Sequence, residues 1–362
     1  MAKAKVAVLK TKPETVIDDY LRLFELAGME KHLDKSAPVI LKDNISWQFM
    51  YPAANTTPWQ LEATIIGLQQ AGYKDISCVQ NDTVVTNPFV GERENKYVPI
   101  FRKYRIPVLF NFRESDMKWI EYKPKGELLV LPKIYPEGIF IPDYFIGKNI
   151  VHLPTLKCHV YTTYTGALKN AFGGLLNRKR HYTHTWIHET LVDLLTIQRE
   201  IHPGIFNIMD GTTAGDGPGP RTMRPIIADL ILASGDPVAI DAVAAKILGF
   251  DPMKLPCIYL SHERGLGVGD PREIEVVGHD ISNTCLNCRV GYNLATRFVS
   301  LFWFGPFKWL QKLLFHTPIV YFFVLGSYIF HDYLWYPFVG KRRVRQWLDG
   351  THWGRLFQKY PY

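Results

Sequence analysis

The sequence is poor in cysteine. Its 362 residues include five cysteines, which follow no regular spacing, and an odd number cannot all pair with one another. This pattern argues against a disulfide framework and favours a reducing compartment. The N-terminal stretch MAKAKVAVLKTKPET has no apolar segment of the kind that a secretory signal needs. We therefore expect the bulk of the protein in the cytoplasm.

The cysteines also lack the spacing of the common metal motifs. Cys285 and Cys288 form one CxxC without a second pair, and His279 is the only histidine nearby. A structural zinc site needs four ligands, and a ferredoxin cluster needs a CxxCxxCxxxCP run. The sequence therefore predicts a two-cysteine turn without metal and no iron–sulfur cluster, and it leaves other cofactors unknown.

Most of the chain has no net charge. Residues 289–362 hold ten Lys/Arg and two Asp/Glu, whereas residues 1–288 hold 32 of each. A protein that binds nucleic acid needs a basic face to neutralise phosphates. The single cluster NRKRH is weak evidence for one, so we expect no nucleic-acid partner.

What the chain does have is an alternation of strand and helix patterns. Short β-branched runs such as KVAVLK and APVILK alternate with amphipathic stretches. Thr57 and Asp236 are expected to cap two of the helices, each followed by a proline suited to the first turn. We predict an α/β body over residues 1–288, built on a mainly parallel, doubly wound sheet in two lobes. Residues 289–362 form a separate C-terminal helical module in this prediction.

One lysine is placed where a helix dipole disfavours a cation. In LKCHVYTTYTGALKNAFGGL, a helix is expected from about Thr165, with Lys169 in or just after its first turn. A cation costs roughly 0.3–1 kcal/mol there, whereas a bound anion is favoured. Lys157, His159 and Lys169 are therefore candidates to converge on a carboxylate or phosphate. The alternative is a solvated lysine with a small penalty.

A glycine-rich loop follows a later strand. The stretch MDGTTAGDGPGP is no Walker A loop, because no Gly-Lys-Ser/Thr follows. Its glycines, including Gly215 and Gly217, permit close backbone approach by a substrate. Asp210 and Asp216 could bind a metal ion or sugar hydroxyls, and an ordinary connection stiffened by proline is the alternative. In open α/β sheets ligands bind beyond strand carboxyl ends, which selects this loop, PTLKCH and the KDN that follows Leu41.

Three histidines recur at helical spacing. His181, His184 and His188 are spaced i, i+3 and i+7, so on one helix they would share a face and could bind a metal. The stretch RKRHYTH precedes the apolar pattern of the helix, however, so His181 could lie outside it. Surface histidines beside a basic run are the alternative.

The C-terminal segment is aromatic as well as basic. It holds 22 of the 49 aromatic residues, and its longest uncharged run, 313–331, is interrupted by Pro318. Its length is near the ~20 residues of a spanning helix. From Pro306 the pattern is amphipathic, and KRRVR supplies charge for anionic headgroups. We expect residues 289–362 to lie in one leaflet as a monotopic module. The alternatives are a single span and a hydrophobic surface for a partner or dimer.

Four segments in order resemble a known family. They are LPTLKCHVYTTYTGALKNAFGG, IMDGTTAGDGPGP, ILASGDPVAIDAVAAKILGFDP and GLGVGDPREIEVVG. Together they resemble the uncharacterised family catalogued as domain of unknown function 362, over about Lys5 to Gly278. Its members are often fused to ferredoxin modules, whose cysteines this chain lacks. YTGALKN is also faintly similar to nickel-pincer lactate racemases. The family resemblance implies a pocket at Lys157–His159, Lys169–Asn170, Asp210–Gly211, Asp236 and Asp241.

These observations favour an enzyme of unassigned redox or proton-transfer reaction. It would act on an anionic small molecule or lipid-linked metabolite at the cytoplasmic face of a membrane, and it could associate with a copy of itself or a redox partner protein. The alternative is a non-catalytic membrane-bound adaptor that binds a cofactor or partner. The expected catalytic residues are His159, Lys169 and Asp210, and the expected substrate-binding residues are Lys157, Asn170, Gly215, Asp216 and Gly217.

Overall fold

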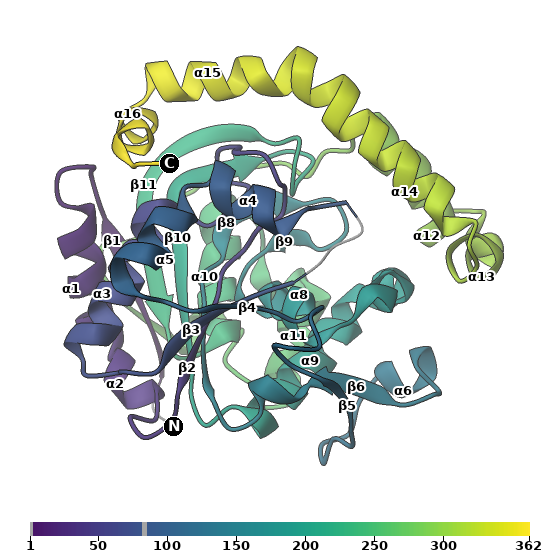
Figure 1. The fold of residues 1–362 in the computed structure, drawn as a ribbon, viewed down its shortest axis with the longest axis horizontal. Helices are drawn as coiled ribbons and strands as arrows, with labels where there is room; N and C mark the ends of the chain where they lie inside the picture. The colour runs from purple at the N-terminus through teal and green to yellow at the C-terminus, as the bar shows by residue number, and fades with distance from the viewer. Residues whose placement is uncertain (1–2, 82–84) are drawn as a thin grey trace.

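A ten-stranded sheet forms the centre of the molecule (Figure 1). The computed structural model describes residues 3–81 and 85–362, apart from the side chain of Arg178. The strands of this sheet are β1 (Ala4–Lys10), β2 (Val39–Lys42), β3 (Ile76–Gln80), β4 (Val108–Phe110), β7 (Asn149–His152), β8 (Thr155–His159), β9 (Thr163–Thr165), β10 (Ile205–Asp216), β11 (Arg224–Ser234) and β12 (Ile274–Gly278). A separate hairpin-like pair consists of β5 (Trp119–Tyr122) and β6 (Ile139–Pro142).

The large sheet is mostly parallel, as predicted. Its order is β12-β1-β11-β10-β7-β2-β3-β4, with β8 paired to both β10 and β9. β11 and β9 run antiparallel to their neighbours, and the remaining pairs of this sheet are parallel. Strands from both halves of the chain alternate in one sheet. The two halves of the body therefore share one sheet, and its division into two lobes stays a prediction.

Helices cover both faces of the sheet (Figure 1). On one face, α1, α3 and α5 contribute buried side chains to one apolar cluster. On the other, α7 to α11 contribute to a second cluster. The helices of the body are α1 (Val16–Ala27), α2 (Met29–His32), α3 (Pro58–Gln70), α4 (Pro88–Glu94), α5 (Tyr97–Tyr104), α6 (Leu131–Ile134), α7 (Ala167–Asn170), α8 (Phe172–Leu175), α9 (Ile187–Ile201), α10 (Pro237–Leu248) and α11 (Pro256–Glu263).

Local sequence signals set the starts of two of these helices. The Thr57 side chain accepts a hydrogen bond from the backbone N–H of Gln60 and forms a capping box at the start of α3. Asp236 accepts from the second and third residues of α10. A proline occupies the first position of each helix. Both predicted caps are confirmed.

The C-terminal segment runs around the outside of the body and then returns to it (Figure 1). One side of its last helix is buried: Trp353 is 0% exposed and its ring centroid lies 5.2 Å from that of Trp59. Further along the segment, Asp332 accepts hydrogen bonds from Trp47 Nε1 and Gln48 Nε2, both at 2.8 Å. The segment contains α12 (Leu294–Trp303), α13 (Gln311–Phe315), α14 (Val320–Tyr328), a π-helical stretch (Ile329–Gly340), α15 (Lys341–Gly350) and α16 (His352–Lys359).

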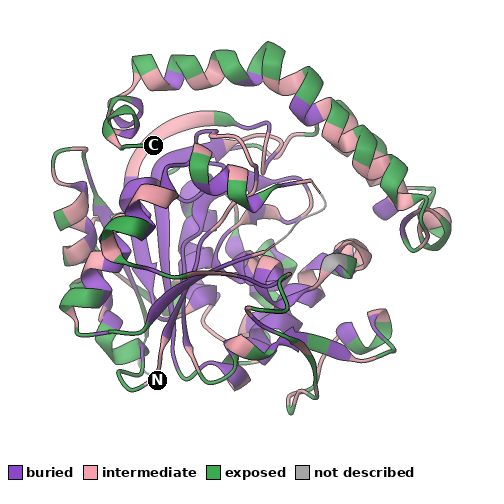
Figure 2. Ribbon diagram, in the orientation of Figure 1, coloured by how far each residue is buried: buried purple, intermediate pink, exposed green. Residues whose placement is uncertain are grey.

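The middle of this segment is apolar and exposed. Figure 2 shows many exposed positions along α12 to α15, in contrast to the buried strands. Large apolar side chains between Leu294 and Val339 make up most of those exposed in the described chain. No single described helix is long and apolar enough to cross a membrane, whereas Lys308–Phe315 and Val320–Gly350, bent by 90° at their junction, reach that length and composition as a pair.

Candidate functional site

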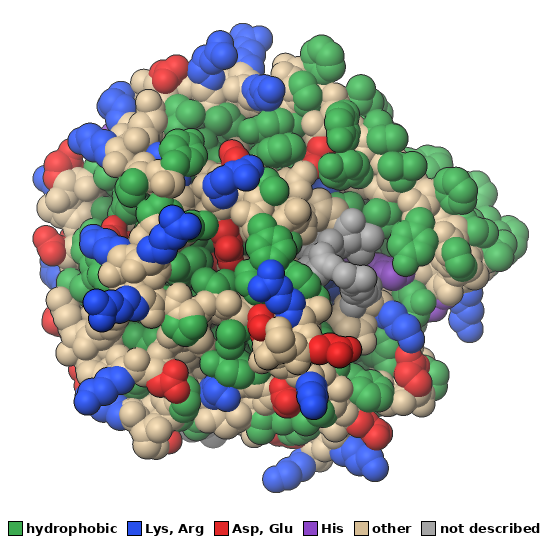
Figure 3. Space-filling model, viewed as in Figure 1, with side chains coloured by type: hydrophobic (Ala, Val, Ile, Leu, Met, Phe, Trp, Pro, Cys, Tyr) green, Lys and Arg blue, Asp and Glu red, His purple; other side chains and the backbone are tan. Residues whose placement is uncertain are grey.

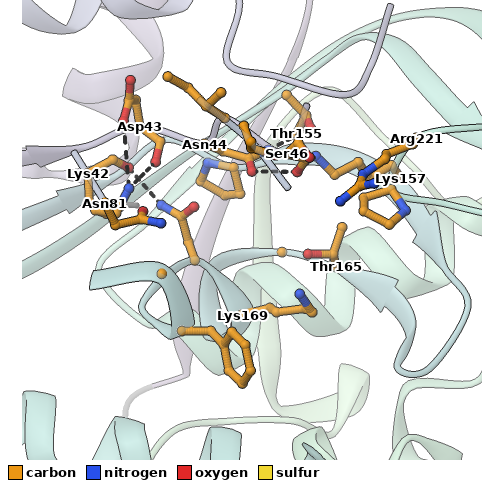
Figure 4. A pocket seen from close by; sticks show the side chains of 18 of the residues that line it. Lys42, Asp43, Asn44, Ser46, Asn81, Thr155, Lys157, Thr165, Lys169 and Arg221 are labelled. Atoms are coloured by element: carbon orange, nitrogen blue, oxygen red, sulfur yellow. Dashed lines mark hydrogen bonds and ion pairs between the residues drawn. The ribbon is translucent and has the colours of Figure 1, made fainter. Parts of the chain in front are cut away.

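A cavity of about 260 Å³ lies beyond the carboxyl ends of β2 and β7, between the sheet and α7. Five cationic side chains line it, whereas Asp43 is the one carboxylate among the described lining residues. Figure 4 shows Lys157 and Arg221 on one side, Lys42 and Asp43 on the other, and Lys169 reaching toward the space from α7. We call this space the basic cavity. Its cations are Lys42, Lys157, Lys169, Arg180 and Arg221.

Lys157 is held rigidly at the wall of the basic cavity. Its side chain is buried, and Nζ donates to the carbonyl oxygen of Ala54 at 2.6 Å and to Ser46 Oγ at 3.2 Å. Burial, and then the charge of Lys169, lower the pKa of Lys157 well below its usual value. A Cβ on Gly215 would lie 2.9 Å from the Cβ of Lys157, so a side chain there would force β8 and β10 apart. Gly215 thus allows the pairing that positions Lys157.

Lys169 lies on a single helical turn, because α7 ends at Asn170. The expected helix from Thr165 is interrupted after α7, and its dipole therefore cannot explain an anion site. Asp241 occupies the free N–H groups instead: it accepts from Ala167 N at 2.7 Å and Leu168 N at 3.0 Å. The protein's own carboxylate takes the place that the sequence suggested for a bound anion.

The pKa of the Lys169 amine lies close to neutral pH. Burial, followed by the charge of Arg180, lowers the pKa of Lys169 to about 8. Its Nζ lies 5.1 Å from the centre of the Phe172 ring, and it forms no ion pair with a described residue. The amine therefore exchanges a proton readily near physiological pH.

The opposite wall is formed by the end of β2. Lys42 Nζ donates to the carbonyl oxygen of Asp43 at 2.6 Å and lies 3.6 Å from its Oδ1. Burial raises the pKa of Asp43, and Lys42 partly opposes this. Asn170 donates from Nδ2 to the carbonyl oxygen of Lys42 at 2.7 Å, which ties α7 to β2. Asn170 lines the basic cavity, together with the KDN segment that the strand-end rule selected.

His159 follows Lys157 on β8 but does not line the basic cavity. Its Nδ1 accepts from the backbone N–H groups of Tyr161 and Thr162, at 3.1 and 3.3 Å, which places the ring proton on Nε2. Burial, and the nearby charge of Lys169, lower the pKa of His159 well below neutrality. The ring is therefore neutral and offers a donor.

The three histidines of the predicted metal site are not on one helix. His181 and His184 lie in a 3-10 segment, Arg178–Trp186, and α9 begins only at Ile187. His184 Nδ1 contacts the carbonyl oxygen of His181 at 2.9 Å, and burial lowers the pKa of His184 and His188 to about 4. A metal site would need the ligand atoms of these histidines within about 4.8 Å of one another, and they are not that close. Among the described residues, one other group of possible ligands meets this distance.

Asp210 lies away from the basic cavity. Its carboxylate accepts hydrogen bonds from Tyr20, Thr57 and Trp59, each at 2.8 Å, and from Thr212 at 2.7 Å. Burial raises the pKa of Asp210, and these donors oppose the rise. With its oxygens occupied, this carboxylate joins α1 and α3 to β10 and is not placed to contact a ligand in the basic cavity.

The glycine-rich loop does not line the basic cavity with the expected residues Asp216 and Gly217. Asp216 accepts from Arg224 Nη2 and Arg289 N, both at 2.8 Å, and neither it nor Gly217 lines the cavity. Gly217 has φ 100°, which allows the chain to turn there. The loop then contributes Arg221, which makes no hydrogen bond within the described chain.

Comparison with known proteins places the chain in an uncharacterised group. It is 30% identical over 269 residues to the thylakoid-associated protein sll1697 of Synechocystis sp. (strain ATCC 27184 / PCC 6803 / Kazusa), an alignment that covers 69% of this chain and 78% of that protein. No solved structure matches the chain significantly. Residues 39–246 match the model of the family described as Domain of unknown function (DUF362), and this stretch includes all the cations of the basic cavity. The chain therefore belongs to this family.

Proposed function

We propose that this protein is a membrane-associated enzyme that binds an anionic small molecule or lipid-linked anion in the basic cavity and transfers a proton to or from it. The observation that carries the proposal is the charge of the cavity wall, where five cations surround about 260 Å³ with one carboxylate. An unpaired buried charge costs several kcal/mol. A bound anion would offset that cost for Lys157, Lys169 and Arg221, which line the cavity and form no ion pair within the described part of the chain.

The geometry suits a ligand with more than one acceptor oxygen. Lys157 and Arg221 approach from one side and Lys169 from α7 (Figure 4). Phosphate and carboxylate groups accept charge-assisted hydrogen bonds from several directions, and Arg can bind two of their oxygens together. We therefore assign Lys157, Lys169 and Arg221 to ligand binding, with Asn170 in support.

Lys169 is the proton-transfer group in this proposal. A general acid or base works best when its pKa lies near the operating pH, and the pKa of Lys169 is lowered to about 8. His159 is less suitable, because its Nδ1 already accepts two backbone N–H groups and its pKa is far below neutrality. Asp210 has no part in this step.

Membrane association is supported by the surface of the C-terminal segment. Figure 3 shows hydrophobic side chains gathered over α12 to α14. Phe322 and Trp309 are each 76% exposed there. Exposed aromatic side chains of this kind bind at bilayer interfaces. The name of the relative from Synechocystis, a thylakoid-associated protein, agrees with a peripheral location on a membrane.

The test is a calorimetric titration of the purified full chain with methyl phosphate. Lys169→Gln and Arg221→Gln each remove a charge-assisted hydrogen bond worth about 1.5–3 kcal/mol, so each should weaken binding by about 10- to 150-fold. Lys179→Gln is the control, because Lys179 is exposed and pairs with Glu137 outside the basic cavity. The proposal is wrong if the wild type does not bind, or if all three variants bind equally.

A non-catalytic adaptor is the second candidate, favoured because Asp43, the one carboxylate among the described lining residues, is already paired with Lys42. Lys169→Arg separates the two, because it keeps the positive charge and removes the amine with the lowered pKa. An enzyme should keep its affinity for methyl phosphate and lose turnover, so that its substrate accumulates in cells. An adaptor should keep both its affinity and its metabolite profile.

A further inference from the structure

A second cavity adjoins the basic one. It has a volume of about 630 Å³ and is lined mainly by apolar side chains of α12, α14 and the π-helical stretch. Val85, His181 and His184 line both cavities, so the two spaces share a wall. We call the second space the apolar cavity. Its volume lies within the range of typical ligand pockets, 300–1,000 Å³.

The shared wall connects the body to the C-terminal segment. His181 Nε2 lies 3.0 Å from the carbonyl oxygen of Phe315, and the ring of His184 stacks on Trp303 at 5.2 Å. Trp303 in turn stacks on Phe315, with ring centroids 4.1 Å apart. The helices with the exposed apolar surface therefore also form the far side of the apolar cavity.

We infer that the two cavities form one bipartite site for an anionic amphiphile, with its phosphate or carboxylate head in the basic cavity and its aliphatic chain in the apolar cavity. This inference rests on the proposed function and specifies the ligand class. Charge complementarity fixes the head on the side of Lys157, Lys169 and Arg221. The apolar cavity can bury the aliphatic chain of the ligand, and the ligand in turn shields from water the apolar side chains that line this cavity.

The amphiphile is tested with a series of monoalkyl phosphates from methyl to dodecyl, each below its micellar concentration. The full chain is held in an uncharged amphipol, and binding to the empty amphipol is subtracted. Affinity should rise by about fourfold for each methylene that enters the apolar cavity, and then level off. Constant affinity along the series, with methyl phosphate still bound, would overturn the bipartite site and leave the proposed function intact. If no member binds, both fail.

A matched pair of variants tests where the alkyl chain of the ligand binds. Val324→Asp places a carboxylate in the apolar cavity, and Leu325→Asp makes the same change at the next residue, which is 53% exposed and does not line it. Val324→Asp should remove the gain with chain length and leave methyl phosphate binding unchanged. Leu325→Asp should bind like the wild type. An equal effect of both variants on dodecyl phosphate would contradict the assignment.

An independent group of side chains lies where the C-terminal segment leaves the body. The sulfurs of Cys158 and Cys288 and a carboxylate oxygen of Asp216 all lie within 4.8 Å of one another. Cys158 is on β8 between Lys157 and His159, Asp216 ends β10, and Cys288 belongs to the CxxC. Both cysteines are buried and free of disulfides.

We propose that Cys158, Asp216 and Cys288 bind one zinc ion. The ion would fix the start of the C-terminal segment to β8, the strand that carries Lys157 at the basic cavity. Two thiolates and a carboxylate are zinc ligands, and three protein ligands leave a position for water. Arg224, paired with Asp216 Oδ2 at 2.8 Å, competes with the ion for that oxygen.

The zinc site is tested by metal analysis of the full chain after equilibration with zinc and dialysis under reducing conditions. We expect one zinc per chain, at least a tenfold loss of affinity in Cys158→Ser and Cys288→Ser, and tighter binding in Arg224→Gln. Cys285→Ser is the control, because Cys285 is exposed and lies outside the group. The proposal is overturned if the wild type retains no zinc, or if Cys285→Ser loses as much as Cys288→Ser.

Discussion

At the scale of single residues, burial sets the chemistry of the basic cavity. Lys157 and Lys169 are both lysines, yet Lys157 is fixed by Ala54 and Ser46 whereas Lys169 contacts an aromatic ring. Desolvation lowers the pKa of each, because it penalises the charged form. An anion that enters the cavity would restore their charged forms, so ligand binding and proton uptake are coupled in this account.

The pH dependence of methyl phosphate binding follows from Lys169. The folded-state pKa of Lys169, about 8, is below its usual value, so the amine loses its charge as the pH rises through about 8. The second pKa of a phosphate monoester is near 6, so the ligand keeps its charge above pH 7. Affinity should therefore fall by up to about tenfold per pH unit above pH 8. Titrations between pH 7 and 9.5 measure this.

Lys169→Arg is the matched control for that experiment. Arg stays protonated over the whole range, so the binding curve of this variant should be flatter than that of the wild type between pH 7 and 9.5. If the wild type is equally flat, Lys169 does not contact the anion in its charged form.

Some of these residues could be predicted from sequence, and others could not. The strand-end rule and the misplaced lysine selected Lys157 and Lys169, and the family resemblance added Asn170; all three line the basic cavity. Arg221 was missed, because it follows the glycine-rich loop at a point where no motif marks it. Asp210 was selected for its place in the loop, but only the fold reveals that its oxygens are occupied by donors from α1 and α3.

At the scale of elements, α7 depends on a residue distant in sequence. Asp241 in α10 accepts from the first N–H groups of α7 and from the hydroxyl of Tyr164 at 2.9 Å. A Cβ on Gly166 would lie 2.1 Å from Asp241 Oδ1, so this close approach requires glycine. Asp241 is therefore a positioning residue for the Lys169 turn.

Asp241→Asn should weaken both the fold and the site. An amide offers one acceptor oxygen and turns its N–H₂ toward backbone N–H donors, so the free energy of unfolding should fall by about 1–3 kcal/mol. The affinity for methyl phosphate should fall as well, since α7, which carries Lys169, loses hydrogen bonds that hold it in place. Urea unfolding and calorimetry measure the two effects. Asp251→Asn, at an exposed cap that accepts from Met253 N and forms an exposed ion pair with Lys254, should change stability by about 0.5 kcal/mol or less.

Helix starts were more predictable than helix lengths. The caps Thr57 and Asp236 act through neighbours in sequence, so their patterns were sufficient. The helix expected from Thr165 and the histidine face at residues 181–188 both failed as elements, because tertiary contacts decide where α7 and α9 begin and end. Asp241 caps the start of α7, and the 3-10 segment before α9 turns His181 and His184 toward the C-terminal segment.

At the scale of the whole molecule, the C-terminal segment both completes the core and carries the apolar surface. Trp347, Trp353 and Phe357 pack into the cluster on the α1–α3 face. The stretch from α12 to α14 remains exposed. The composition of residues 289–362 predicted an aromatic, basic helical region, but it could not separate these two roles, since partners from distant strands decide which aromatic residues are buried.

Two substitutions should separate the two roles. Trp353→Ala removes a fully buried ring that packs against Trp59 and donates to Asp229 at 2.7 Å, and should cost about 3–5 kcal/mol of unfolding free energy. Phe322→Ser changes an exposed ring and should alter stability by about 0.5 kcal/mol or less, while lowering liposome binding by about tenfold. Urea unfolding and liposome flotation provide the readouts. Flotation that is unchanged in Phe322→Ser would argue against this membrane face.

The most direct test of the account is to locate a bound anion. Crystals of the full chain would be soaked in tungstate, a phosphate-like anion whose metal scatters anomalously. The account predicts an anomalous peak inside the basic cavity, within hydrogen-bonding distance of Lys157, Lys169 and Arg221. Peaks confined to the exposed basic residues of α15, with the basic cavity empty, would contradict it.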